Sequence, residues 1–250
     1  MEQFFTKDYT GEPFILFNTP HLVGLGIVLL VVLSMFLVKR SQSPRLRNAV
    51  RCSLAGTLLV VEISWHLWNY FTGQWTLDKM LPLHLCSIMV WLSIYMLLTK
   101  NYSIFEFAYL LGIAGALQAL LTPDAGRYGF PHFRFFQVMM SHGALVTAAV
   151  YMAVVEGYRP YPKSLVRVLV GANIYMAFVG LVNWLVGGNY MFIAHKPETA
   201  SLLDVLPPWP WYIGIIEILG LVFILLFYAP YGLKDWKGRR RPVIQESSVS

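Results

Sequence analysis

The chain has 250 residues, of which 57% are hydrophobic and 13% charged. This charged fraction is about half of that usual in soluble domains, which excludes an ordinary soluble protein and indicates a membrane protein. The net charge of +6 does not indicate nucleic-acid binding, because the basic residues stand in short clusters between apolar runs, where they orient helices and meet lipid headgroups. Two cysteines without a CxxC motif exclude a disulfide framework.

Seven apolar stretches predict seven transmembrane helices. At a rise of ~1.5 Å per residue, each crosses or nearly crosses a hydrocarbon core of ~30 Å. The third and fourth stretches are short and closely spaced, which predicts a tight helical hairpin. The stretches cover residues 21–38, 49–70, 83–99, 104–121, 135–155, 165–186 and 211–230.

These stretches predict an all-α, polytopic membrane protein with one membrane domain. Residues 1–20 form an N-terminal segment without the basic start of a signal peptide, residues 21–230 the seven-helix domain, and residues 231–250 a basic and polar tail expected to be disordered. Fourteen of the 19 lysines and arginines follow odd-numbered stretches. By the positive-inside rule the N-terminus faces outward and the C-terminus lies in the cytoplasm. The long outer connections 122–134 and 187–210 are candidates for a lid over an outward-facing site.

Polar residues inside the apolar stretches gather toward the outer ends of the predicted helices. By helical rise, the carboxylates, imidazoles and thiol among them lie ~6 to ~12 Å below those ends. Burying such groups in hydrocarbon is costly, so they usually face an interior cavity, and their shared depth predicts one common cavity. The residues in this set are Glu62, His66, Cys86, Gln118, Arg134, His142, Asn183 and Glu217.

The segment LPLHLC, residues 81–86, contains the candidate nucleophile. Pro82 suits the first position of a helix, which places Cys86 in or just past the first turn, where the helix dipole favours a thiolate. The same helix start offers N–H donors to an oxyanion. His84 and Cys86 point to opposite sides of a regular helix, so the base for Cys86 comes from another helix, as His66 or His142. Cys86 as a packing residue is the alternative.

Glu62 and His66 are four residues apart and share a helix face. Glu62 is therefore expected to orient the imidazole of His66. The pair either shapes a reaction cavity or acts as a buried polar link between helices.

Three motifs carry a resemblance: LPLHLC, FPHFRFFQVMMSHG and NYMFIAHKPETASLLDVLPPWPWY. They resemble the YwaF-type bacterial integral membrane proteins, a family related to an animal seven-span acyltransferase of ether phospholipids and more distantly to androgen-induced membrane hydrolases. The resemblance implies an intramembrane acyl-transfer site with Cys86 as nucleophile and His142 as base. The resemblance carries over the chemistry and not the substrate; our own expectation is a membrane phospholipid or lysolipid substrate and a bacterial cytoplasmic membrane location.

The sequence thus favours a lipid acyltransferase or acyl hydrolase that works through a thioester, with no cofactor and no metal. Around Cys86 and His142, the supporting or substrate-binding candidates are Glu62, His66, His84, Gln118, Arg134, Asn183 and Glu217. One alternative is a transporter or small-molecule binder that uses its buried Glu and His groups. The last is a metal or haem site from His66, His84, Cys86 and His142, which lack a known ligand spacing.

Overall fold

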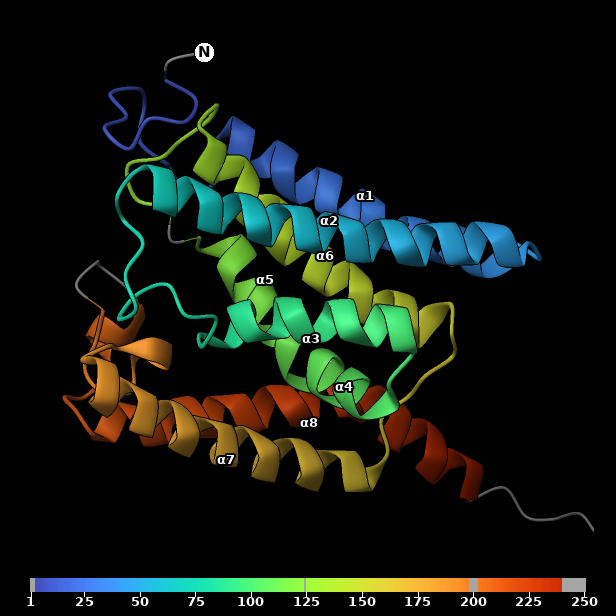
Figure 1. The fold of residues 1–250 in the computed structure, drawn as a ribbon. Helices are drawn as coiled ribbons and strands as arrows, with labels where there is room; N and C mark the ends of the chain where they lie inside the picture. The colour runs from blue at the N-terminus through green and yellow to red at the C-terminus, as the bar shows by residue number, and fades with distance from the viewer. Residues whose placement is uncertain (1–2, 124, 198–201, 240–250) are drawn as a thin grey trace, which may run out of the picture.

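The computed structural model describes residues 3–123, 125–197 and 202–239. Regular structure in these ranges is entirely helical, which confirms the all-α prediction (Figure 1). The elements are α1 (Thr19–Arg40), α2 (Pro44–Phe71), α3 (Leu85–Thr99), α4 (Tyr102–Phe107), the π-helix η1 (Ala108–Gly112), α5 (Ile113–Leu121), α6 (Phe133–Val154), α7 (Pro162–Val186), the 3₁₀-helices η2 (Tyr190–Phe192) and η3 (Leu202–Val205), and α8 (Trp211–Arg239).

Each of the seven predicted stretches corresponds to helix. Six helical segments within the described ranges are long and apolar enough to cross a membrane, counting α4, η1 and α5 as one. The seventh, α3, has 15 residues and is ~22 Å long by helical rise. The chain is therefore a multi-pass membrane protein in which one apolar helix is shorter than the hydrocarbon core.

Two details differ from the sequence prediction. The fourth stretch is not one regular α-helix, because a π-helical turn interrupts it at Ala108–Gly112; such turns shift the helix face and recur near functional sites. Helix α8 continues to Arg239, so residues 231–239, expected in a disordered tail, are helical. The rest of that tail, residues 240–250, lies outside the described residues.

Local signals in the sequence explain where the helices begin and end. The side chain of Asn18 accepts the N–H of His21 and caps α1, and Ser43 caps α2 in the same way. The predicted hairpin is present: Lys100 ends α3 in a left-handed conformation and Asn101 caps α4. Gly187 ends α7 with φ of 68°, a conformation that glycine adopts without strain.

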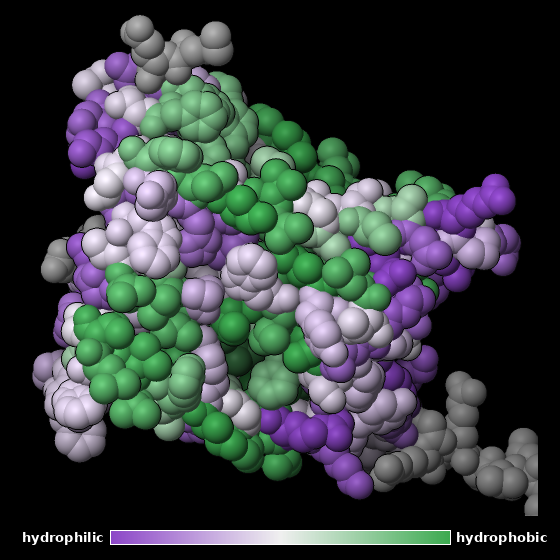
Figure 2. Space-filling model, viewed as in Figure 1, coloured by the Kyte–Doolittle hydropathy of each residue, from purple (hydrophilic) through white to green (hydrophobic). Residues whose placement is uncertain are grey.

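Helix α6 is the centre of the bundle. It packs against α1, α2, α3 and α5, whereas α7 and α8 pair with each other and approach the rest through α4 and η1 (Figure 1). In its most apolar window 72% of the α6 residues are buried, against 11% in α1, α7 and α8. The outer helices therefore present apolar side chains to lipid; Figure 2 shows such side chains across much of one face, with hydrophilic ones concentrated toward its ends.

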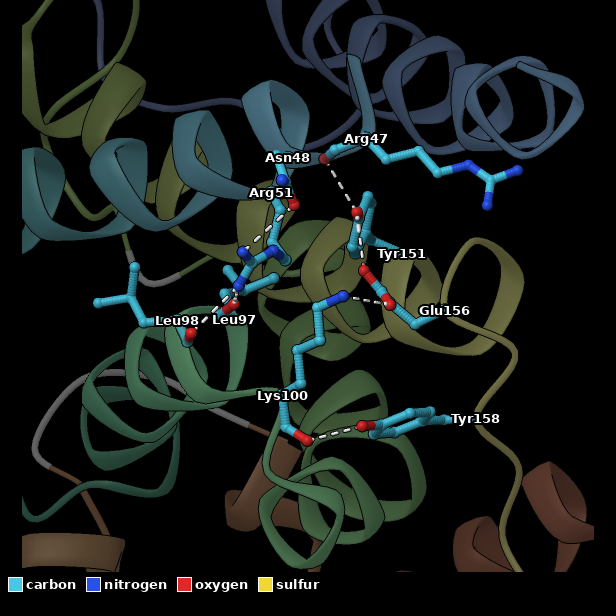
Figure 3. A network of polar contacts seen from close by, with 9 residues as sticks. All are labelled: Arg47, Asn48, Arg51, Leu97, Leu98, Lys100, Tyr151, Glu156 and Tyr158. Atoms are coloured by element: carbon cyan, nitrogen blue, oxygen red, sulfur yellow. Dashed lines mark hydrogen bonds and ion pairs between the residues drawn. The ribbon is translucent and has the colours of Figure 1, made fainter. Parts of the chain in front are cut away.

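A polar network closes the end of the bundle that holds the C-termini of α3 and α6, here called the basic end (Figure 3). Lys100 Nζ lies 2.8 Å from Glu156 Oε2, and Tyr158 donates to the carbonyl of Lys100 at 2.7 Å. The guanidinium of Arg51 donates to the carbonyls of Leu97 and Leu98. These contacts tie the C-terminus of the short helix α3 to α2 and to the segment after α6. The opposite end of the bundle carries the N-termini of α3 and α6 and is called the site end.

Candidate active site

A cavity of about 360 Å³ opens at the site end between α2, α3 and α6. Six of the nine site residues predicted from the sequence line it; five of them belong to the set predicted from shared depth, and the sixth is His84. These six are Glu62, His66, His84, Cys86, Arg134 and His142. The wall is completed by Trp65, Lys79, Met80, Leu81, Pro82, Ser87, Val90, Ala119, Gln137, Val138, Ser141 and Phe192.

Cys86 is the second residue of α3. The helix begins at Leu85, not at Pro82, which lies in the preceding turn; the thiol is therefore closer to the helix start than the sequence predicted. The N-cap residue His84 makes no capping hydrogen bond with its side chain, and the first N–H groups of a helix have no intrahelical acceptor. The thiol of Cys86 thus lies beside the free backbone N–H groups at the N-terminus of α3.

Helix α5 backs the sulfur closely. A methyl group built on Gly115 would lie 3.6 Å from Cys86 Sγ and 3.7 Å from a methyl carbon of Leu85. The absent side chain at Gly115 therefore leaves space directly beside the sulfur. The second cysteine, Cys52, is exposed on α2 and is not among the cavity residues.

The imidazole of His142 has a defined tautomer. Its Nδ1 lies 2.9 Å from the carbonyl oxygen of Val138, one turn earlier in α6. A carbonyl oxygen only accepts hydrogen bonds, so Nδ1 carries the proton and Nε2 of the neutral ring carries the lone pair. His142 therefore has the form of a base that acts through Nε2.

His66 is held differently. Its Nε2 lies 3.5 Å from Glu62 Oε1, and the indole N–H of Trp75 donates to its Nδ1 at 3.1 Å. Because Nδ1 accepts from Trp75, the proton of the neutral ring is on Nε2, facing the buried carboxylate. The expected Glu62–His66 pair is present, and it engages both imidazole nitrogens. Between the two candidate bases, only His142 keeps a ring nitrogen in the form needed to remove a proton from a thiol.

His84 lies outside the helix, so its position relative to Cys86 does not follow helical phase. Its Nδ1 accepts the backbone N–H of Met191 at 3.2 Å. Its ring centroid is 5.3 Å from that of Tyr190 and 5.1 Å from that of Phe192. His84 therefore joins the start of α3 to the connection between α7 and α8.

The cavity also contains cationic groups. The guanidinium carbon of Arg134 lies 4.1 Å from the centre of a Trp65 ring, and its Nη1 donates to the amide oxygen of buried Gln137. The cation–π contact and the hydrogen bond fix the direction of the guanidinium. Lys79, exposed in the connection before α3, contributes a second positive charge to the wall.

Three predicted site residues are not among the cavity lining. Gln118 is exposed on α5, and Glu217 is exposed on α8. Asn183 is buried, and its amide bonds the backbone of Tyr190, accepting the N–H at 2.8 Å and donating to the carbonyl at 3.0 Å. Asn183 thus shapes the connection that carries Phe192.

Sequence reasoning missed two residues. Phe192, which lines the cavity, lies in the motif NYMFIAHKP, but nothing in its local spacing connects it with Cys86. Glu106 is a fully buried carboxylate within the fourth stretch, toward the basic end; its Oε1 accepts from Ser164 and from Arg167. An acidic residue inside an apolar run is a signal in itself.

The metal alternative has no matching cluster in the described ranges. No group of three or more His, Cys, Asp or Glu side chains there is arranged to hold a metal ion.

Comparison with known proteins gives one family. No curated protein and no solved structure matches the chain. A sequence profile of the TMEM164 family matches residues 16–228, which include every helix from α1 to α7, most of α8 and the whole cavity. The chain therefore belongs to the TMEM164 family.

Proposed function

We propose that this protein is an intramembrane lipid acyltransferase in which Cys86 carries the acyl group as a thioester. The observation that supports this most directly is that Cys86, in the first turn of α3, and His142, with its lone pair on Nε2, line one cavity. A thiol at a helix start and an imidazole base are the parts that nucleophilic acyl transfer requires.

The first half-reaction forms the thioester. His142 Nε2 accepts the proton of Cys86 Sγ, and the thiolate attacks the carbonyl carbon of a lipid ester. The N–H groups at the start of α3 stabilise the oxyanion of the tetrahedral intermediate. The ester C–O bond then breaks, and the leaving alkoxide takes the proton from His142 and departs as a lysolipid.

The second half-reaction restores the thiol. The hydroxyl of an acceptor lysolipid gives its proton to His142 as its oxygen attacks the thioester carbonyl. The C–S bond breaks, and the thiolate recovers the proton from His142. Water as the acceptor gives a free fatty acid by the same steps, so transferase and hydrolase share this site.

The length of α3 supports an ester of a membrane lipid as the substrate. Held at its C-terminus at the basic end, α3 is ~8 Å shorter than a ~30 Å hydrocarbon core. Its N-terminus, with Cys86, therefore lies just below the opposite boundary, where the ester carbonyls of lipids lie. Arg134 and Lys79 on the cavity wall suit a phosphate headgroup. We place the site in the outer leaflet of a bacterial cytoplasmic membrane, in agreement with the charge distribution and the resemblance.

The test is reconstitution in vesicles with phospholipid labelled in its acyl chain and an unlabelled lysolipid. The wild type should form labelled protein that hydroxylamine releases, and labelled new phospholipid. Cys86→Ala should abolish both, while Cys52→Ala, which removes the other cysteine, should abolish neither. Full transfer by Cys86→Ala would overturn the proposal, and flux of a solute in the same vesicles without acyl transfer would favour a transporter.

A further inference from the structure

The connection between α7 and α8 contains a strained segment, residues 189–193, here called the strap, which contributes Phe192 to the wall of the cavity. Met191 and Phe192 both adopt left-handed conformations, with φ of 58° and 54°. Bulky residues rarely take this conformation, which is strained and persists only where surrounding contacts impose it. Such strain recurs at ligand clamps and active sites.

The strap is held from several elements. Tyr190 is fully buried; its hydroxyl donates to the carbonyl of Leu77 at 2.6 Å and accepts the N–H of Leu81 at 2.8 Å. Burial raises the pKa of the Tyr190 hydroxyl, which keeps it protonated and able to donate. These bonds fix the strap to the segment that leads into α3.

Two further contacts set the position of Phe192 itself. The hydroxyl of buried Tyr212, on α8, donates to the Phe192 carbonyl, and the N–H of Met191 donates to His84. The Phe192 ring packs against the His84 ring, with the centroids 5.1 Å apart. The ring is thereby placed in the cavity wall beside His84, at the start of α3.

We infer that Phe192 determines the fate of the acyl group, by keeping bulk water away from the thioester so that a lipid hydroxyl takes it. The inference rests on the proposed function. A thioester hydrolyses whenever water reaches its carbonyl carbon in place of an acceptor hydroxyl, and enclosure of a reactive intermediate suppresses this side reaction. Water in the cavity loses hydrogen bonds beside an aromatic ring, so the ring disfavours its entry. The hydrocarbon chain of a lysolipid makes favourable apolar contacts there, so its hydroxyl can still reach the thioester. Phe192 touches neither reacting bond and acts as a specificity-determining residue.

The experiment uses full-length protein with Cys86 already acylated by a labelled donor. Lysolipid is added, and the ratio of labelled free fatty acid to labelled phospholipid is measured. Phe192→Ala should raise this ratio roughly tenfold; because the measurement starts from acylated Cys86, it does not depend on the rate at which the label first joins the protein. Phe192→Leu, which keeps an apolar side chain over the cavity, and Phe178→Ala, which removes an exposed ring on α7, should leave the ratio near the wild-type value.

Tyr212→Phe provides an independent variant that leaves Phe192 intact. It removes only the hydroxyl that holds the Phe192 carbonyl, and it should raise the ratio in the same direction by a smaller factor. This variant decides the question if Phe192→Ala does not fold. An unchanged ratio in the folded variants, with wild-type acylation of Cys86, overturns the inference and leaves the proposed function standing. Absence of any acylated Cys86 in the wild type overturns the proposed function and the inference with it.

Discussion

The Nδ1 atom of His142 lies 2.9 Å from the carbonyl oxygen of Val138, one helical turn earlier. This backbone contact assigns the proton to Nδ1 and the lone pair to Nε2, without the carboxylate that performs this task in many catalytic triads. In a membrane, a carbonyl orients the ring without adding a buried charge. The carboxylate in the cavity, Glu62, is engaged with His66 instead.

The two histidines should therefore respond differently to substitution. His142→Ala removes the base and should lower the rate of Cys86 acylation by roughly 10²- to 10⁴-fold, the usual contribution of general base catalysis. His66→Ala should lower it by less than about tenfold, because both nitrogens of His66 are already engaged with Glu62 and Trp75. Single-turnover labelling with an excess of phospholipid gives both rates. Equal losses in the two variants would contradict the assignment of the base.

Gly115 should control access to the sulfur. A methyl group there would make ordinary van der Waals contacts, 3.6 Å from Cys86 Sγ, so Gly115→Ala should fold normally. It should nevertheless slow acylation by roughly tenfold or more, since the methyl group takes the space that the tetrahedral intermediate needs. Gly26→Ala on α1 is the matched control, because nothing lies within 4 Å of a methyl group there. A wild-type rate of acylation in Gly115→Ala would show that substrate approaches from another side.

The sequence predicted the helices well because apolar length is a local property. The prediction rested on apolar length alone; the structure adds the local end signals, since Asn18 and Ser43 cap α1 and α2 and Gly187 ends α7. Depth along each helix was also predictable, since helical rise is constant, and it placed Glu62, Cys86 and His142 at a common level. The depth of a residue does not determine the direction of its side chain, so Gln118 and Glu217 share the level but not the cavity.

What remained unpredicted depends on contacts between distant segments. The choice of His142 over His66 rests on hydrogen bonds, and the sequence alone left both open until the resemblance favoured His142. Phe192 reaches the cavity because Asn183, Tyr190 and Tyr212 fold the strap back, and no local pattern encodes that path. The apolar run around Glu106 marks it as unusual, but the sequence does not show its partner, because Arg167 lies on another helix.

The Trp75 contact should matter for stability more than for chemistry. Trp75→Phe keeps the apolar ring but leaves His66 Nδ1 without its donor, which should cost about 1 kcal/mol of unfolding free energy. Acylation of Cys86 should change by less than about threefold, because the lost hydrogen bond lies outside the reacting groups. Thermal unfolding in detergent and single-turnover labelling test the two parts. Trp184→Phe, on an exposed side chain of α7, is the control for loss of an indole. A large loss of acylation in Trp75→Phe would instead make the His66 ring part of the reaction.

The pairing of Glu106 with Arg167 predicts a dependence between two substitutions. Glu106 is fully buried, and its Oε1 accepts from Ser164 and Arg167. Arg167→Ala should lower the unfolding midpoint in detergent, because it leaves a carboxylate buried without its counter-charge. Adding Glu106→Gln to Arg167→Ala should recover part of the loss, since a neutral amide needs no counter-charge and still accepts from Ser164.

Lys163→Ala, which removes an exposed cation one turn earlier on α7, should have little effect on the same measurement. A double variant no more stable than Arg167→Ala would show that the guanidinium stabilises α7 through its other contacts and not by neutralising Glu106. Recovery in the double variant would mean that the buried charge of Glu106 destabilises the fold unless the guanidinium of Arg167 neutralises it. In that case the ion pair joins α7 to the end of α4, directly before the π-helical turn at Ala108–Gly112.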